Sequence, residues 1–423
     1  MKRLPTVLIV SIALIFSVVG CDNVAPKPEE TSDTPAAASQ DRRAPMHGGP
    51  MTGPDAGPHP FSAPVFDIEA APNGNVLVAE TVLGGVATGA STIREVLTQG
   101  NRSGTDEIVE FTTPDGVTPI HGMAAVGQRN IVAARGGLDL AENAAVVRIT
   151  PAGSQVIADI ETYETENDPD KFAIEDWKDP KCAPASGPFT PGPQSNPYGL
   201  APVSDDVFLV ADAAGNTLLR VTDDGEMELV ALFTPPTTGP NGDGGASATP
   251  GPWLEFPFDG GTPNAPSDDP TEGNCYVQPV PNSVAVGEDG YIYVGELTGV
   301  GALGVSRVWR IKPGTTGAVC PSADCQMVFN GFTSIINMAF GPDGSLYVVE
   351  YDEAGWLTSL GVGTPEGGTV NKCDVGNGTC EVATLGGEEL SGLTFPTALT
   401  FDKRGDAWLL ENNLAAPTVR KLE

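Results

Sequence analysis

The fifteen-residue stretches NSVAVGEDGYIYVGE (282–296) and INMAFGPDGSLYVVE (336–350) share one pattern: an apolar strand, a turn with glycine, and a second apolar strand that ends in an acid. Glycine tolerates the positive φ of a tight hairpin turn, and the flanking Val, Ile, Leu and Tyr favour strands. The pattern recurs in FDIEAAPNGNVLVAE (66–80), HGMAAVGQRNIVAAR (121–135), YGLAPVSDDVFLVAD (198–212) and TALTFDKRGDAWLLE (397–411). The repeat therefore predicts six β-hairpins.

A third strand-like run follows each hairpin. These runs are EIVEFT (107–112), AVVRIT (145–150), TLLRVT (217–222), SRVWRI (306–311), GTVNKC (368–373) and TVRKLE (418–423). Several are followed by a fourth, such as MELVALF (227–233) and CQMVFNGF (325–332). Four antiparallel strands in each of six units are typical of a propeller. We therefore predict an all-β, six-bladed, NHL-like β-propeller over residues 61–423, with insertions near 161–196 and 234–280.

The sixth unit stops at its third strand, because TVRKLE ends at Glu423. A segment near residues 55–64 is expected to supply the missing outer strand. It would close the ring and protect the strand edge that is otherwise open.

The first residues are typical of an export signal. Lys2 and Arg3 precede an apolar run over 7–19, which is shorter than the roughly 20 residues of a membrane span. Residues 1–20 are therefore interpreted as a signal peptide. The run ends Val-Val-Gly-Cys and resembles the lipobox of bacterial lipoproteins, which implies that Cys21 is fatty-acylated and anchors the chain. We expect a lipid-anchored protein of the cell envelope that faces the periplasm or the exterior, with inner or outer membrane left open.

Residues 21–60 are rich in Pro, Ala, Ser, Gly and Glu and have few large apolar side chains. Such a segment buries too little surface to offset its chain entropy, so we expect a flexible linker. The whole chain has a formal net charge of −33. This charge repels nucleic acid and anionic lipid and attracts cations. We expect a monomer that binds no nucleic acid.

Seven cysteines are present, and lipidation of Cys21 would leave an even number in an oxidising compartment. Two pairs are close in sequence, and the remaining two residues lie in the long insertions. The predicted disulfides are Cys182–Cys275, Cys320–Cys325 and Cys373–Cys380.

The blocks NPYGLA (196–201), ADAAGNTLLRV (211–221), VPNSVAVGEDGYIYVGELTG (280–299), SRVWRI (306–311) and NGFTSIINMAFGPDGSLYVVE (330–350) resemble the ScyD/ScyE family. That family consists of NHL-like propeller proteins named after members of the scytonemin pathway of cyanobacteria. The resemblance covers roughly residues 61–423. It implies an exported propeller and a role in the periplasmic maturation of a secondary metabolite.

The last residues of the six hairpins occupy equivalent positions and would form a ring in a closed propeller. They are Glu80, Arg135, Asp212, Glu296, Glu350 and Glu411. Such a ring could bind a cation or ligand, or it could consist of hydrogen bonds and ion pairs that stabilise the blades.

The innermost strands should line a central channel, and their first residues are Phe66, His121, Tyr198, Asn282, Ile336 and Thr397. Asp67, Asn282 and Asn337 are candidate oxygen ligands for calcium, the only cofactor that this donor set suggests, because calcium takes 6–8 oxygen ligands. His121 is the candidate general base, since its ordinary pKa lies near neutrality. The alternative is that His121 is a hydrogen-bonded structural residue of the channel.

Three functions follow from these patterns. The first is a membrane-anchored propeller that binds an unidentified protein or small-molecule ligand. The second is an accessory protein of metabolite assembly, as the ScyD/ScyE resemblance implies. The third is a calcium-dependent lactonase or esterase of the gluconolactonase and paraoxonase type. Whether the chain is an enzyme is left open, because fold alone does not give function.

Overall fold

The computed structural model describes residues 57–80, 90–97, 104–112, 119–127, 129–136, 144–170, 193–233, 254–257, 274–298, 303–361 and 363–422. The predicted signal peptide, Cys21 and Cys182 lie outside these residues. The side chain of Cys275 lies outside them as well, so the predicted Cys182–Cys275 disulfide stays a prediction.

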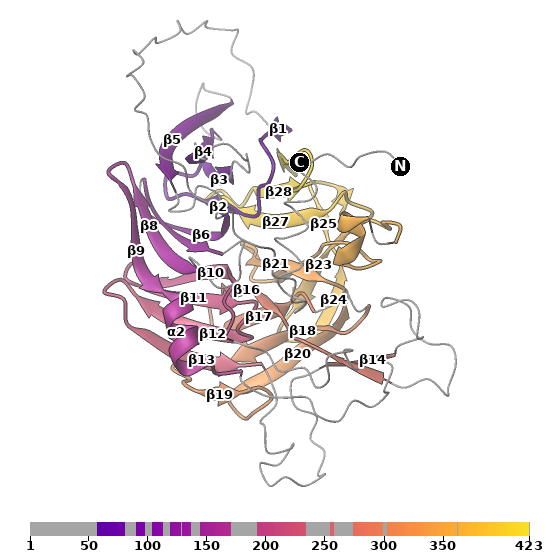
Figure 1. Ribbon diagram of the computed structural model, residues 1–423. Helices are drawn as coiled ribbons and strands as arrows, with labels where there is room; N and C mark the ends of the chain where they lie inside the picture. Colours follow the sequence, from indigo (N-terminus) through magenta and orange to yellow (C-terminus); the bar gives the residue numbers. More distant parts are fainter. Residues whose placement is uncertain are drawn as a thin grey trace, which may run out of the picture.

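Six units, each with four antiparallel strands, surround a common centre and form a β-propeller (Figure 1). In blade 3 a short fifth strand pairs in parallel with the outer strand. Blade 1 contains β2 (Ile68–Ala70), β3 (Val76–Glu80), β4 (Ala90–Val96) and β5 (Thr105–Thr112), and blade 2 contains β6 (Ile120–Gly127), β7 (Asn130–Arg135), β8 (Ala145–Thr150) and β9 (Gly153–Asp159). Blade 3 contains β10 (Pro197–Ser204), β11 (Val207–Asp212), β12 (Thr217–Thr222) and β13 (Met227–Leu232), and blade 4 contains β16 (Pro281–Val286), β17 (Ile292–Glu296), β18 (Ser306–Ile311) and β20 (Cys325–Phe332). Blade 5 contains β21 (Ile335–Phe340), β22 (Leu346–Glu350), β23 (Thr369–Asp374) and β24 (Thr379–Val382), and blade 6 contains β27 (Pro396–Phe401), β28 (Ala407–Glu411), β29 (Thr418–Lys421) and β1 (His59–Pro60). The six predicted hairpins and the all-β propeller are confirmed.

The ring is closed by the first described strand. β1 pairs with β29, with His59 opposite Val419 and Pro60 opposite Thr418. The innermost strands β2, β6, β10, β16, β21 and β27 contact one another in this order, and β27 contacts β2 again. The segment near 55–64 therefore supplies the outer strand of blade 6, as predicted.

Apolar side chains pack between neighbouring blades rather than inside one sheet. One cluster joins blades 3 and 4 through Phe233, Trp309 and Ile311. Another joins blade 6 to blade 1 through Val65, Trp408 and neighbouring residues. Burial of such large side chains contributes roughly 1.5–3 kcal/mol each, so the contacts between blades hold the ring together.

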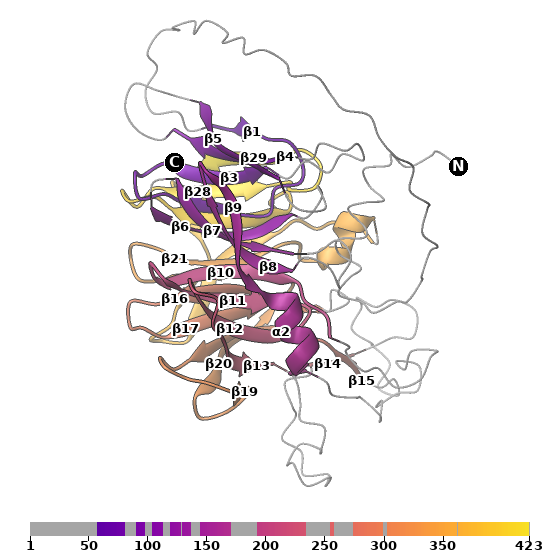
Figure 2. The ribbon, with the colours of Figure 1, turned by 60° about the vertical axis from the view of Figure 1, so that its left-hand side comes forward.

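A few elements lie outside the blades. Helix α2 (Ile160–Asn167) follows β9, and the 3₁₀ helix η2 (Trp356–Leu360) follows β22. β14 (Leu254–Pro257) pairs with β15 (Asn274–Val277), and β25 (Thr384–Leu385) pairs with β26 (Glu388–Glu389). Figure 2 shows α2 beside the ends of the blade 3 strands. Within the described part of the chain, neither helix has the length and apolar character needed to cross a bilayer.

One blade was assigned incorrectly from sequence. EIVEFT (107–112) was expected as the third strand of blade 1, but it belongs to β5, the fourth strand. The third strand is β4, which pairs with β3 on one side and β5 on the other. EIVEFT contains more residues with high strand propensity than β4, so the sequence pattern indicated EIVEFT and not β4 as the third strand.

Two of the predicted disulfides are present. Cys373 and Cys380 face each other across β23 and β24. Cys320 and Cys325 join the end of β19 (Ala318–Val319) to the start of β20. Because β19 pairs in parallel with β13 of blade 3, this disulfide fixes a contact between blades 3 and 4.

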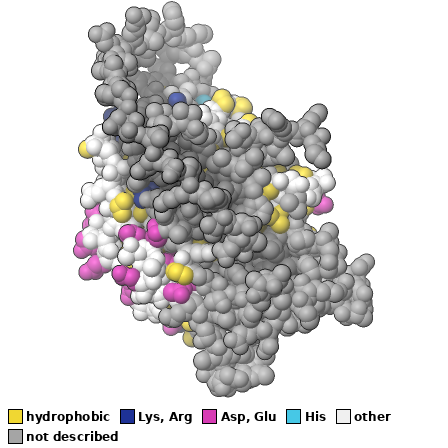
Figure 3. All heavy atoms as spheres, in the orientation of Figure 1, with side chains coloured by type: hydrophobic (Ala, Val, Ile, Leu, Met, Phe, Trp, Pro, Cys, Tyr) yellow, Lys and Arg dark blue, Asp and Glu magenta, His cyan; other side chains and the backbone are white. Residues whose placement is uncertain are grey.

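The described surface is acidic on the side of blades 2 and 3, at the left of Figure 3. Two acids of blade 3 form ion pairs with arginines, Asp223 with Arg148 and Glu228 with Arg220. The surface potential there should repel anions and attract cations.

Candidate functional site

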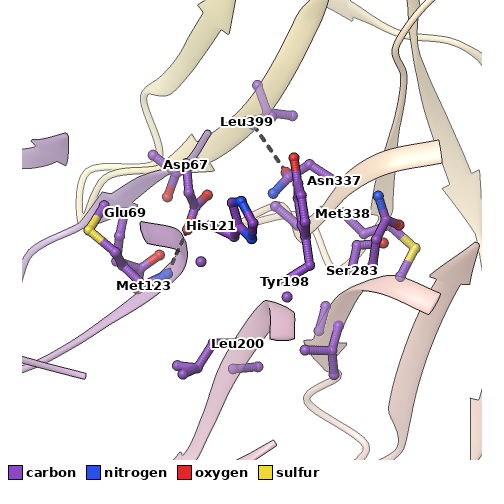
Figure 4. Close-up of a pocket in the computed structure, with 18 of the residues that line it drawn as sticks. Asp67, Glu69, His121, Met123, Tyr198, Leu200, Ser283, Asn337, Met338 and Leu399 are labelled. Atoms are coloured by element: carbon purple, nitrogen blue, oxygen red, sulfur yellow. Dashed lines mark hydrogen bonds between the residues drawn. The ribbon is translucent and has the colours of Figure 1, made fainter. Parts of the chain in front are cut away.

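A cavity of about 280 Å³ lies in the central channel. The innermost strands of all six blades line it, and Figure 4 shows the side chains around it. A second, smaller cavity of about 50 Å³ shares five lining residues with the first, namely Phe66, His121, Tyr198, Asn282 and Ile336. These five therefore form a partition across the channel. They are also five of the six residues that the repeat alignment placed at the start of the innermost strands.

The partition is built from stacked rings. The rings of His121 and Tyr198 stack with centroids 4.6 Å apart, and Phe66 meets His121 edge to face at 4.8 Å. Burial lowers the pKa of His121 to about 4, so the imidazole is neutral at neutral pH. The predicted candidate base thus lies in the channel, its Nδ1 has no hydrogen-bond partner within the described residues, and its role as a base stays a prediction.

The predicted calcium donors all line the channel, and each contacts the next blade around the ring. Met123 N donates to Asp67 Oδ2 at 2.8 Å, and Leu399 N donates to Asn337 Oδ1 at 3.1 Å. The amide of Asn282 donates to Ile336 O at 3.5 Å. The backbone of a neighbouring blade therefore donates a hydrogen bond to one carboxylate oxygen of Asp67 and to the amide oxygen of Asn337. This arrangement ties blades together, and calcium binding by the three residues stays a prediction.

Glu69 is a channel residue that the repeat alignment did not single out. It lines the cavity two positions after Asp67, on the same face of β2. Burial raises the pKa of Asp67 to about 7, and burial together with the charge of Asp67 raises the pKa of Glu69 to about 8. Near neutral pH this pair therefore carries at least one proton.

Two polar atoms on the opposite side of the cavity are buried within its wall. Oδ1 of Asn282 and Oγ of Ser283 have no hydrogen-bond partner within the described chain. Burying such groups without a partner costs about 1–3 kcal/mol each. Among the described residues that line the cavity, none is lysine or arginine. The cavity therefore suits a small molecule that is polar and either neutral or positively charged.

The raised pKa values predict a pH dependence of stability. Asp67 and Glu69 hold their protons more tightly in the folded protein than in the unfolded chain, where the pKa lies near about 4. Their contribution to stability is thus full below about pH 4 and is lost as pH rises through about 7 to 8. The free energy of unfolding, measured by chemical denaturation, should therefore fall as the pH rises from 4 to 8. Asp67→Asn should make this fall less steep by up to about 1.4 kcal/mol per pH unit.

Glu288→Gln is the matched control for this series, because Glu288 is an exposed acid in the turn between β16 and β17. It should leave the slope unchanged. Equal slopes for the wild type and Asp67→Asn would contradict the prediction.

The predicted ring of terminal residues is present at one end of the second strands, and the acids form hydrogen bonds within the propeller. Four of them accept from the third strand of their own blade: Glu80 from Arg94, Glu296 from Trp309, Glu350 from Asn371 and Glu411 from Arg420. These four donors occupy one register position, diagonal to the acid. This recurrence of Arg, Trp or Asn is the signal that could have revealed the pairing from sequence.

The two other members differ. Asp212 accepts from Ser195 Oγ, from Asn196 N at 2.7 Å and from Gly215 N at 3.1 Å, which caps the turn after β11. Arg135 is buried at the end of β7. The contacts of the acids are those of a structural ring, and ligand binding by the ring stays a prediction.

No protein-family model matches the chain, and no curated protein sequence matches it. Among solved structures, it is similar to virginiamycin B lyase from Staphylococcus aureus, with a TM-score of 0.40, 14% identity, and coverage of 82% of this chain and 77% of the lyase. YCF48 bound to D1 peptide gives a TM-score of 0.41, 11% identity, and coverage of 88% and 86%. The WD40 propeller domain of Doa1 gives 0.38, 12%, and coverage of 88% and 95%. Likenesses this weak carry no argument about function, and the propeller fold rests on the six sheets themselves.

Proposed function

We propose that this protein is an exported, lipid-anchored propeller that binds a small polar molecule, neutral or cationic, in its central channel. The observation that carries the proposal is the 280 Å³ cavity with the Asp67–Glu69 pair on one side and the unpartnered Asn282 and Ser283 atoms on the other. Ligand pockets typically enclose about 300–1,000 Å³, so the ligand would be small. Binding would supply the hydrogen bonds that these buried groups lack.

The cellular role that we propose is that of an accessory protein at a membrane surface. The lipobox-like Val-Val-Gly-Cys at 18–21 supports anchoring through Cys21. The resemblance to the ScyD/ScyE family supports a role in periplasmic maturation of a secondary metabolite. Both points rest on the sequence alone.

The test uses the full-length chain purified in detergent and a panel of small amines, polyols and lactones. At least one compound should raise the melting temperature, because a ligand that binds only the folded state stabilises it by mass action. At pH 9, where Glu69 is ionised, Glu69→Gln should weaken the binding of a cationic ligand at least tenfold in calorimetry, since it removes one charge from the cavity. Lactones in the panel also report hydrolysis, the reaction that the calcium-dependent alternative requires.

Glu288→Gln serves again as the control, and it should bind as the wild type does. Binding in the channel would be contradicted if no compound of the panel raised the melting temperature. It would also be contradicted if a cationic ligand raised the melting temperature of Glu69→Gln as much as that of the wild type. In the same preparations, Cys21→Ala should move the chain out of the membrane fraction. Retention of that variant in the membrane would contradict the anchor.

A further inference from the structure

Three acids outside the channel converge at the connection between blades 2 and 3. Glu164 belongs to α2, Asp168 is the residue after the helix, and Asp170 follows two positions later. One carboxylate oxygen from each lies within 4.8 Å of the others. Asp168 has a left-handed backbone, with φ 42° and ψ 64°, and its N–H donates to Glu164 O at 2.7 Å. The end of the helix therefore turns the three carboxylates toward one another.

Glu164 is the unusual member of this cluster. Only 1% of the residue is exposed, and neither oxygen of its carboxylate has a hydrogen-bond partner within the described residues. A buried carboxylate without a partner is strongly unfavourable, and such groups normally pair or coordinate a metal. One of its oxygens lies within 4.8 Å of a carboxylate oxygen of each of the other two acids, so a missing cation is the simplest partner for it.

Asp170 is fixed in place by blade 3. The residue is fully buried, and its Oδ2 accepts from Asn216 Nδ2 at 2.8 Å. Its Oδ1 has no partner within the described chain. Asn216 Oδ1 in turn accepts from Val280 N at 3.3 Å, at the entry to blade 4. One oxygen of Asp170 is therefore oriented by the propeller, and the other is left for the cluster.

The turn between β11 and β12 approaches the cluster closely. A Cβ atom at Gly215 would lie 3.1 Å from Oε2 of Glu164, so glycine leaves space for the carboxylate there. Asp212 lies in the same turn and is fully used by its own hydrogen bonds. Burial and the charges of Asp212, Asp170 and Asp168 raise the pKa of Glu164 to about 10.

We propose that Glu164, Asp168 and Asp170 bind one calcium ion, which joins helix α2 to blade 3. The donors are all oxygens, which suits a hard cation. Calcium–oxygen distances of 2.3–2.6 Å place ligands on opposite sides of the ion about 4.6–5.2 Å apart. The three carboxylate oxygens lie within 4.8 Å of one another, close enough to share one such ion. Calcium completes its shell with water and backbone oxygens. Magnesium requires a tighter octahedron, so it should bind more weakly.

The experiment is a thermal melt of the full-length chain in detergent, in EDTA and in a calcium titration, with calorimetry of calcium binding. At a calcium concentration about 100 times Kd, the melting temperature should rise by about 3 °C. Glu164→Gln should abolish both the shift and the binding isotherm. In EDTA, this variant should melt at or above the wild type, because it removes one of three mutually repelling carboxylates.

Two controls locate the ion. Glu166→Gln changes an exposed acid of the same helix and should keep the full shift, and Asp67→Asn in the channel should keep it as well. Asp170→Asn should lose it, which provides a second variant if Glu164→Gln folds poorly. The assignment would be overturned if the wild type bound no calcium or if magnesium gave an equal shift in melting temperature. It would also be overturned if Asp67→Asn lost the calcium shift or if Glu164→Gln kept it.

Discussion

Replacing Glu296 with alanine should lower the free energy of unfolding by about 3–5 kcal/mol, the range expected when one partner of a buried ion pair is removed. Its carboxylate is fully buried and accepts from Arg307 Nε at 2.7 Å and from Trp309 Nε1 at 2.6 Å. Alanine would remove the two hydrogen bonds that Arg307 donates to this carboxylate, and it would leave the buried indole N–H without the acceptor that Glu296 provides. Chemical denaturation of the wild type and the variant measures the loss.

Glu411→Ala is the matched control, because it occupies the same position in blade 6. The Glu411 side chain is 14% exposed, and Arg420 also donates twice to Glu388. The arginine therefore keeps a carboxylate partner, and the loss should be only about 1 kcal/mol. Equal losses in the two variants would mean that burial does not set the strength of these contacts.

Removal of the closing strand should have the second large effect. A chain that begins at Ala63 lacks the β1 pairing with β29, the bond from Phe61 N to Pro417 O at 2.9 Å and the bond from Ser62 N to Glu80 Oε1 at 2.6 Å. At about 1 kcal/mol for each hydrogen bond, it should be less stable by about 3 kcal/mol than a chain that begins at Gly57. The exposed edge of β29 should also promote association.

Denaturation midpoints and size-exclusion chromatography check both parts of this prediction. The chain that begins at Gly57 should elute as a monomer and unfold at the higher denaturant concentration. Identical midpoints and elution volumes for the two chains would show that β1 is not needed to close the ring.

The blades could be predicted because their signals are local. The turns Pro-Asp-Gly at 342–344 and Glu-Asp-Gly at 288–290 specify hairpins within fifteen residues. The prediction for the third strand of blade 1 was wrong for a related reason. ASTIREV (90–96) has polar residues in adjacent pairs and only two large apolar ones, whereas EIVEFT concentrates strong strand formers. Propensity alone does not decide which strand lies in the middle of a sheet.

The channel could be predicted only in part. Equivalent positions in the repeats identified the partition residues, because each inner strand starts at the same height in the ring. The hydrogen bonds of Asp67 and Asn337 to the next blade could not be foreseen, since they depend on the packing of neighbouring sheets. Glu69 carried a usable signal, its spacing of two from Asp67 along a strand.

The acidic cluster was missed because it lies outside the repeat. Helix α2 has few apolar residues, so its sequence shows little helical periodicity. Its boundaries nevertheless carried signals: Asp159 caps the first turn by accepting from Thr162 N, and Pro169 follows the last turn. The burial of Glu164 had no signal at all, because the turn that covers it comes from blade 3.

The pairing of β1 with β29 also constrains the order of folding. His59 and Val419 are about 360 positions apart, so closing this contact first would require ordering nearly the whole chain in one loop, at an entropic cost that grows with loop length. Hairpins that form within fifteen residues can assemble much earlier. β1, the first described strand of the chain, therefore pairs last, and the ring stays open until the other strands of blade 6 have formed.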